Sequence, residues 1–361
     1  MPSLRPPTIE DVWYGDRPAA RGIRAALAPA SMLFGAGVAV RNALYASGLL
    51  PAGRAPARVV SVGALRVGGA GKTPFVLWLA RRLCEQGMRP CIVTRGYGGS
   101  GGENAFVLRA TDASTSTIVD RAGDEAVLLA IRSGCPVAVG HDRLAACQTA
   151  WKKLIENGEP PDVFVLDDGF QHRALARDVD IVMTSDADAS MRLLPAGPLR
   201  EPVSALGRAA VAIALAAPDA RAAASATGAT RVIRAAMRPS MLVSSVADVS
   251  GDAPSWLSGR EIVAVAGIAR PERFLDDLSR AGARVTAAIV RRDHHRYDEP
   301  DGAEIDRAVA SSPGAVVVTT EKDLVKLTHL RPRLGMLALR VELELESRKD
   351  ENTLIGLVTR K

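Results

Sequence analysis

Short apolar runs recur along the first part of the chain, and most intervals between them carry the mixed apolar and polar pattern of surface helices. Buried strands are predicted at 58–63, 90–94, 137–139, 163–166, 180–183 and 211–214. Helices are predicted at 73–86, 124–132 and 144–157. Strands that alternate with helices in this way indicate an α/β fold with a parallel sheet and helices on both faces.

A second, shorter series of the same kind begins after residue 261. Its predicted strands are 262–265, 285–290, 315–319 and 336–345, and its predicted helices are 272–281 and 303–311. An Ala-rich stretch at 218–228 is a candidate linker or surface helix. We therefore predict a helical N-terminal segment (1–50), a core domain (51–232) and a smaller C-terminal α/β domain (233–361), whose last helix packs back on the core.

The N-terminal segment contains an uncharged stretch at 25–40 that is rich in Ala and Gly and lies between Arg24 and Arg41. It is too short to predict a bilayer span. It fits equally a helix lying in a membrane interface and an ordinary helix packed on the domain. The first sixteen residues lack the apolar region of a secretory signal.

Composition narrows the possible partners. The net charge of +6 favours an anionic partner. No RNA-recognition signature, zinc-finger spacing or strip of aromatic and basic residues accompanies this charge, so we predict no nucleic-acid partner. The four cysteines include no C-x-x-C pair and are predicted to be reduced core thiols rather than metal ligands.

The strongest local signal for chemistry is Gly68-Gly69-Ala70-Gly71-Lys72-Thr73, which follows a predicted strand and opens a helix. Glycines allow backbone N–H groups to surround phosphate oxygens, and the helix N-terminus adds partial positive charge. Lys72 is suited to the β- and γ-phosphates, and the Thr73 hydroxyl to Mg²⁺. Arg66 stands where the strict phosphate-binding loop has Gly. A flexible loop without a ligand is the less favoured alternative.

Three acidic motifs could complete such a site. The strand at 163–166 ends in Asp167 and Asp168, which suits Mg²⁺ binding near a phosphate-binding loop, although Asp also begins turns. Asp124 and Glu125 open a helix, where acids often only complement the helix dipole. Asp293-His294-His295 offers a histidine made more basic by a neighbouring carboxylate, or simply two solvated histidines in a loop.

Together with the loops 95–99, 168–172 and 194–202, with Gly267 and 271–274, and with 320–323, these motifs resemble the tetraacyldisaccharide 4′-kinase family, in the same order and over most of the chain. The resemblance implies a P-loop kinase fold, with ATP and Mg²⁺. The implied reaction transfers the ATP γ-phosphate to the 4′-hydroxyl of tetraacyldisaccharide 1-phosphate, which forms lipid IVA in lipid A and lipopolysaccharide biosynthesis. It also implies a peripheral, monotopic protein at the cytoplasmic face of the inner membrane. The lipid-linked disaccharide and the membrane surface are then the partners, and no obligate protein partner is expected.

The resemblance also implies roles for residues. Asp124 would be the catalytic base, paired with His294 or, as second candidate, His295. Lys72 would act on the phosphates, and Thr73, Glu125, Asp167 and Asp168 would lie around Mg²⁺. The expected acceptor contacts are Arg95, Tyr97, Arg143, Gln171, His172 and Arg200.

Two rival functions remain open on sequence. A P-loop phosphotransferase acting on a soluble small molecule would not need the N-terminal segment. A nucleotide-gated adaptor at a membrane surface would bind ATP without transferring phosphate, and it would need no base.

Overall fold

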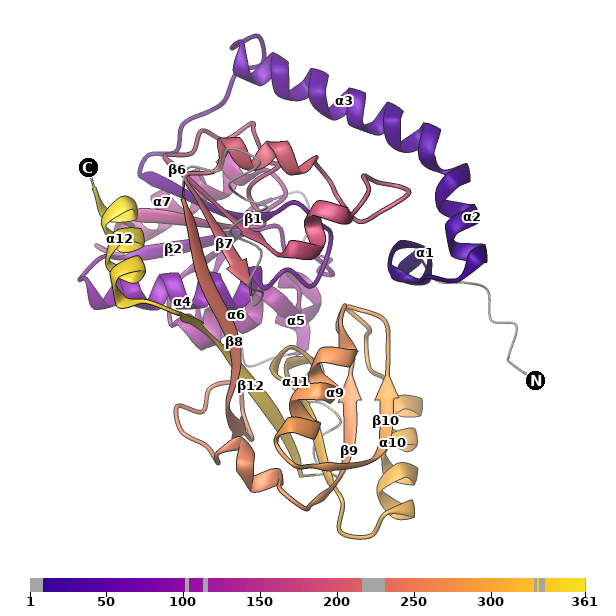
Figure 1. Ribbon diagram of the computed structural model, residues 1–361. Coiled ribbons are helices and arrows are strands. Elements are labelled where there is room, and N and C mark those ends of the chain that lie inside the picture. The colour runs from indigo at the N-terminus through magenta and orange to yellow at the C-terminus, as the bar shows by residue number, and fades with distance from the viewer. Residues whose placement is uncertain are drawn as a thin grey trace.

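The computed structural model describes residues 9–100, 104–112, 116–215, 231–327, 330 and 335–360. Within these ranges, twelve strands form one continuous sheet in the order β10-β9-β11-β12-β8-β7-β6-β1-β5-β2-β4-β3 (Figure 1). The strands are β1 (Arg58–Ala64), β2 (Pro90–Thr94), β3 (Phe106–Leu108), β4 (Val137–Val139), β5 (Val163–Asp167), β6 (Val179–Thr184), β7 (Val211–Leu215), β8 (Val232–Val243), β9 (Glu261–Ala266), β10 (Arg284–Val290), β11 (Val316–Thr320) and β12 (Met336–Leu345). Pairing is parallel except for β3 with β4 and β8 with β12.

The helices follow the predicted alternation with the strands. They are α1 (Ile9–Tyr14), α2 (Pro18–Ala26), α3 (Ala28–Ala46), α4 (Lys72–Glu85), α5 (Ser116–Ala122), α6 (Asp124–Ser133), α7 (Arg143–Glu156), α9 (Pro271–Arg280), α10 (Glu299–Ser311), α11 (Glu321–Leu327) and α12 (Arg348–Thr359). The predicted α/β fold with a mostly parallel sheet is confirmed. The predicted linker at 218–228 lies outside the described residues.

Helices cover both faces of the sheet. Successive side chains of each strand point to opposite faces, so neighbouring residues pack against different helices. Val60 packs in the cluster that includes residues of α4 and α6, whereas its neighbour Val59 packs in the cluster that includes residues of α7. Val165 and Phe164 of β5 divide in the same way. Both faces are therefore buried, which explains the nearly continuous apolar runs in the sequence.

β1 lies between β5 and β6, and this position determines where a ligand can bind. β1 leads to α4 and the strands on one side of the sheet, and the chain later returns through β5 and β6 to both flanks of β1. In an open α/β sheet, a crevice forms outside the carboxyl ends of the strands at such a switch point. Here those ends carry the loop after Ala64 and the acidic pair that begins at Asp167.

Two long antiparallel strands, β8 and β12, connect the two halves of the sheet (Figure 1). The boundary predicted at residues 232/233 lies at the start of β8, so the sheet continues without interruption through it. The division into domains stays a prediction. α12 contacts the core: Arg82 of α4 pairs with Glu351 at 2.8 Å, and Arg58 donates a hydrogen bond to the carbonyl of Leu357.

Three helices form an N-terminal arm (α1–α3) that lies beside the core (Figure 1). Its contacts with the loop before β7 are specific: Trp13 donates a hydrogen bond to the Pro195 carbonyl, and Ser31 bonds to the backbone of Leu193. Asn42 donates a 2.7 Å hydrogen bond to Glu201, which is fully buried. Among the described residues, no helix alone is long and apolar enough to cross a bilayer. α2 and α3 meet those criteria only as a pair, and they are bent by 49° at their junction.

The cysteines are all free thiols. Cys91, Cys135 and Cys147 are buried, as predicted, but the prediction of a core thiol is wrong for Cys84. Cys84 lies in the last turn of α4, where the helix surface meets solvent.

Candidate active site

The loop between β1 and α4 has the geometry of a phosphate-binding loop. Gly68, Gly69 and Gly71 have φ angles of 67°, 53° and 75°, in the left-handed region that glycine adopts without steric cost. Gly71 is the N-cap of α4, and Lys72 begins the helix. The free N–H groups of the first turn of α4, which includes Thr73, therefore lie beside the loop.

Arg66 does not disturb this loop, although it stands where the strict motif has Gly. Its side chain is buried, 3.3 Å from Asp188, and it donates a 3.0 Å hydrogen bond to Ser185. Its backbone neighbour Val67 donates to the carbonyl of Pro198 at 2.9 Å. The arginine therefore fixes the outer side of the loop to the segment before β7.

Asp168 is held at the centre of the crevice by two cations. Its φ of 57° is unusual for a residue with a side chain and turns the carboxylate towards the loop. Lys72 lies 3.5 Å away, and Arg200 donates two hydrogen bonds of 2.7 and 2.8 Å. Burial alone would raise the pKa of Asp168, but Lys72 and Arg200 outweigh it, so the pKa is lowered and the group is a carboxylate.

Asp167 has the opposite electrostatic environment. It is buried at the end of β5, and its Oδ1 atom has no hydrogen-bond partner. Burial, reinforced by the carboxylates of Glu125 and Asp168, raises its pKa to about 7. A cation placed among these carboxylates would satisfy the orphaned oxygen and restore the ionised form.

This arrangement fits Mg²⁺. Asp167, Asp168, Glu125 and the Thr73 hydroxyl would supply hard oxygen ligands of the kind that Mg²⁺ prefers. Among the described residues, no group of three or more His, Cys, Asp or Glu side chains forms a ready metal site. Mg²⁺ commonly retains waters and takes ligands from substrate phosphates, so an incomplete protein shell is expected for it.

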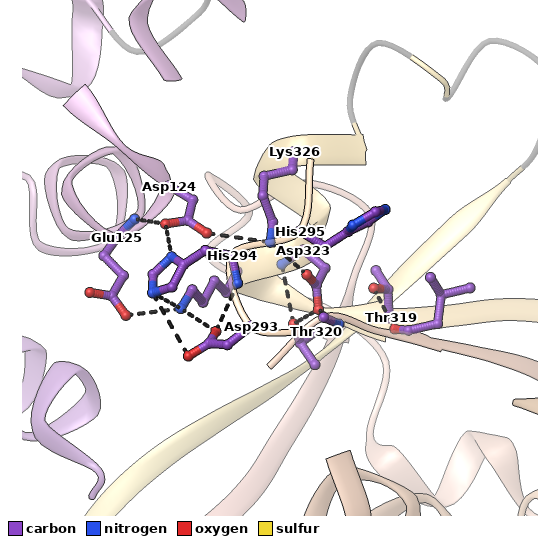
Figure 2. Close-up of polar contacts among 12 residues, drawn as sticks. Asp124, Glu125, Asp293, His294, His295, Thr319, Thr320, Asp323 and Lys326 are labelled. Atoms are coloured by element: carbon purple, nitrogen blue, oxygen red, sulfur yellow. Dashed lines mark hydrogen bonds and ion pairs between the residues drawn. The ribbon is translucent and has the colours of Figure 1, made fainter. Parts of the chain in front are cut away.

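Asp124 and His294 form a second cluster, which joins α6 to the loop between β10 and α10 (Figure 2). His294 Nδ1 lies 3.0 Å from Asp124 Oδ1, and the ring of Tyr97 lies 4.8 Å from the imidazole. Burial would raise the pKa of Asp124, but the hydrogen bond with His294 and the charges of Lys322 and Lys326 lower it to about 2. Burial likewise opposes protonation of His294, yet its bond to Asp124 leaves the histidine pKa raised.

The structure distinguishes between the two adjacent histidines. The φ of His294 is 58°, which directs its side chain towards Asp124. His295 instead lies 2.7 Å from Asp301 and is engaged within the C-terminal half. The partner of Asp124 is therefore His294.

The predicted acceptor residues are not gathered at one place. Gln171 and Arg200 both donate to the carbonyl of Ala64, directly before the loop. Arg143 is buried and bonds to the Gly140 carbonyl at 2.8 Å, while Arg95 donates to His141. Tyr97 is 60% exposed beside His294. His172 is half-buried, and burial together with Arg143 lowers its pKa. Their roles in acceptor binding stay predictions.

Sequence reasoning assigned no role to two lysines that the structure places at this site. Lys322 and Lys326 of α11 contact Glu125, Asp124 and His294. The stretch 320–323 was noted for its resemblance to the family. However, lysines in a short helix carry no sign of partners nearly two hundred residues away.

Comparison with known proteins decides the family. The model of the family described as tetraacyldisaccharide-1-phosphate 4′-kinase matches residues 23–359. This chain belongs to the tetraacyldisaccharide-1-phosphate 4′-kinase family. The tetraacyldisaccharide 4′-kinase of Anaeromyxobacter dehalogenans (strain 2CP-C) is 42% identical over 336 residues, which cover 88% of this chain and 86% of the relative. That of Syntrophus aciditrophicus (strain SB) is 37% identical over 347 residues, 90% of each chain.

A solved structure of the 4′-kinase family extends the likeness to three dimensions. The crystal structure of LpxK from Aquifex aeolicus in complex with ATP aligns with a TM-score of 0.75 at 30% identity, over 94% of this chain and all of that one. The predicted P-loop kinase fold is thereby confirmed.

Proposed function

We propose that this chain transfers the γ-phosphate of ATP to the 4′-hydroxyl of tetraacyldisaccharide 1-phosphate, which forms lipid IVA. Membership of the 4′-kinase family supports the reaction class. One structural observation carries it further: a series of neighbouring charged side chains extends from the phosphate-binding loop to the pair formed by the buried Asp124 and the partly buried His294. Lys72 faces Asp168, the charges of Asp168 and Glu125 both act on Asp167, and Glu125 adjoins Asp124.

The loop and Lys72 bind the nucleotide phosphates in this proposal. Phosphoryl transfer depends mainly on positioning and charge stabilisation. The glycine N–H groups and the α4 N-terminus surround the β- and γ-phosphates, and Lys72 compensates their charge. Arg200 holds Asp168 in place, so Lys72 and Asp168 keep a fixed separation. Mg²⁺, when bound near Thr73, Asp167, Asp168 and Glu125, neutralises charge that develops on the transferred group.

Asp124 receives the proton of the sugar hydroxyl, and His294 assists it. A carboxylate with a pKa of about 2 is a weak base towards a free hydroxyl. The hydroxyl becomes far more acidic as its oxygen bonds to phosphorus. Asp124 therefore orients the nucleophile first and accepts the proton late, and His294 holds the carboxyl group in place through its contact with Oδ1.

We propose that the arm places the protein peripherally at a membrane surface, which the resemblance to the family implies to be the cytoplasmic face of the inner membrane. Apolar side chains of α3 and the turn after it are exposed: Met32 and Leu33 at 76%, Leu49 at 73% and Val40 at 60%. The basic residues Arg21 and Arg41 lie along the same arm and favour anionic lipid headgroups, whereas Arg24 donates hydrogen bonds to the carbonyls of Val12 and Gly15. An acceptor with four acyl chains would be presented at this surface, and no obligate protein partner is proposed.

A micelle assay tests the proposal. Labelled ATP, Mg²⁺ and tetraacyldisaccharide 1-phosphate are supplied to the wild type and to Asp124→Ala. Label that moves to the lipid in the wild type and is largely lost in the variant supports both the substrate and the base. If folded, ATP-binding wild type transfers phosphate only to a soluble acceptor, the soluble-substrate kinase replaces this proposal. Transfer to no acceptor would favour the adaptor.

A further inference from the structure

Helix α11 brings two lysines, Lys322 and Lys326, to the Asp124–His294 pair from the opposite half of the molecule. Figure 2 shows Lys326 beside Asp124. Lys322 and Lys326 are four residues apart and therefore lie on one face of the helix. Their side chains are only 14% and 7% exposed. Burying two ammonium groups is costly unless each is fully paired, so their partners indicate what they do.

All three N–H groups of the Lys322 ammonium have acceptors. Its Nζ lies 3.0 Å from Glu125 Oε1, 2.9 Å from Asp293 Oδ1 and 3.2 Å from His294 Nε2. An ammonium has three donors and no acceptor. Each N–H of Lys322 therefore has an acceptor, one on α6 and two on the loop between β10 and α10 that carries His294.

Lys326 holds the other end of the pair. Its Nζ lies 3.3 Å from Asp124 Oδ2 and 2.9 Å from Asp323 Oδ1. Asp124 Oδ1 accepts from His294 and from the backbone N–H of Glu125. Asp124 Oδ2 makes no hydrogen bond, so the ion pair with Lys326 is the contact that restrains this oxygen.

The contacts of Lys322 also determine which nitrogen of the imidazole carries the proton. Because Lys322 can only donate, its 3.2 Å contact requires the lone pair of His294 Nε2, and this contact is shorter than the 3.7 Å approach of Nε2 to Asp293 Oδ2. The ring proton is then on Nδ1, where it is donated to Asp124 at 3.0 Å. The opposite tautomer would bring an N–H group against the ammonium.

We propose that Lys322 and Lys326, here called the lysine clamp, are positioning residues for phosphoryl transfer. Lys322 fixes the Nδ1–H tautomer of His294, and Lys326 fixes the orientation of Asp124. This inference rests on the proposed function, since it assigns the clamp to the same reaction.

A purely structural role in attaching α11 to α6 is already filled by other residues. Glu321 pairs with Arg132 of α6 and with Arg340 of β12, the latter at 2.7 Å, and all three side chains are buried. This ion network joins the two halves a short distance from the clamp. The clamp lysines contact the candidate catalytic pair instead, which is the reason to assign them to the chemistry.

The test compares Lys322→Met, Lys322→Arg and Lys326→Met with Lys153→Met, which removes an exposed lysine of α7. In the full-length protein, we expect kcat to fall about ten- to hundredfold for both Met variants of the clamp, as for other misplaced catalytic groups. The KM for ATP should stay at the value of the Lys153→Met control. The melting temperature should fall in both Met variants, because carboxylates lose their cation, so kcat is measured well below the melting temperature of each variant. Lys322→Arg should recover part of the loss, because it retains the charge and the donors.

Nitrogen-15 NMR of histidine-labelled protein reads the tautomer directly, and His294→Gln assigns the signal. We expect the Nδ1–H form in the wild type and its loss in Lys322→Met. A wild-type Nε2–H form overturns the proposal whether or not the variants fold. Unchanged kcat in both Met variants overturns it too, as does a fall in kcat that tracks lost ATP binding. Absence of phosphate transfer by a wild type that shows the expected tautomer would instead refute the proposed function.

Discussion

Arg200 and Asp168 form a two-pronged ion pair, with each terminal nitrogen of the guanidinium within 2.8 Å of a different carboxylate oxygen. One of those nitrogens also donates to the carbonyls of Ala64 and Arg66, at the root of the phosphate-binding loop. Arg200 therefore connects the loop after β1 to the acid after β5. The spacing between Lys72 and the proposed Mg²⁺ ligands depends on this single side chain.

Replacing Arg200 by lysine should show that activity depends on the two-point geometry of the Arg200–Asp168 pair and not only on the positive charge. A lysine ammonium cannot reproduce the planar fork that holds both oxygens of Asp168. We expect Arg200→Lys to lower kcat/KM about ten- to hundredfold, the usual effect of losing a hydrogen bond to a charged group. The measurement is steady-state phosphate transfer at saturating Mg²⁺.

Arg89→Lys is the matched control for this substitution. Arg89 forms a similar pair with Asp162, at 3.3 and 3.4 Å, on the exposed surface. Exposed pairs contribute little, so the control should retain wild-type kinetics. Equal activity of the two variants would show that the fork on Asp168 has no part in the reaction.

The Asp124–His294 contact leads to a prediction that separates neighbouring residues. We expect Asp124→Asn and His294→Gln each to reduce kcat by about a hundred- to ten-thousandfold, as for loss of a general base. His295→Gln should retain kcat, because His295 contacts Asp301 and not Asp124. ATP binding, measured by calorimetry, should be the same in all three. A large loss of kcat in His295→Gln alone would contradict the pairing.

The parts of this site that could be read from the sequence are the local ones. The loop at 68–73 is a single contiguous stretch, and β1 and β5 are apolar because both faces of the sheet are covered. By contrast, β8 was missed because Arg234 and Pro239 interrupt its apolar pattern, and Pro239 is tolerated only at an irregularity opposite β12.

Residue patterns alone could not predict the contacts between residues far apart in the sequence. Asp124 and His294 are 170 positions apart, and Lys322 and Glu125 are 197 apart. Each residue alone fits a solvated helix or loop equally well. The resemblance to the family predicted the pairing of Asp124 with His294, whereas the contact between Lys322 and Glu125 is known only from the structure.

The raised pKa of Asp167 predicts an unusual dependence of stability on pH. In the fold its pKa is about 7, whereas an unfolded chain has the ordinary value of about 3.9. The unfolded chain therefore loses this proton first, and the stabilising effect of protonation disappears as the pH rises from about 4 to about 7. In EDTA, Asp167→Asn should melt at a higher temperature than the wild type at pH 8. The difference should vanish near pH 4.

Asp162→Asn provides a control of opposite sign. A hydrogen bond from Arg89 lowers the pKa of Asp162, so its ionised form stabilises the fold. Removing that charge should lower the melting temperature at pH 8 only slightly, because the pair with Arg89 is exposed. A lower melting temperature for Asp167→Asn at pH 8 would mean that its carboxylate is paired in the metal-free protein.

The exposed apolar face of α3 predicts that substitutions there weaken membrane binding and leave ATP binding unchanged. Met32 and Leu33 lie in the first two turns of α3, where their side chains are largely solvent-exposed. Two glutamates at these positions would add negative charge to a surface proposed to meet anionic lipid. We expect Met32→Glu/Leu33→Glu to lose co-sedimentation with anionic vesicles and to raise the KM for the lipid acceptor. The Kd for ATP should be unchanged.

Val249→Glu tests whether any added acid has the same effect. Val249 is 93% exposed in the loop that follows β8, in the other half of the molecule. This variant should sediment with vesicles as the wild type does. If it loses binding equally, the interaction reflects net charge rather than insertion of the α3 face. If the α3 variant binds vesicles normally but still shows a raised KM, α3 contacts the acyl chains of the acceptor without anchoring the protein.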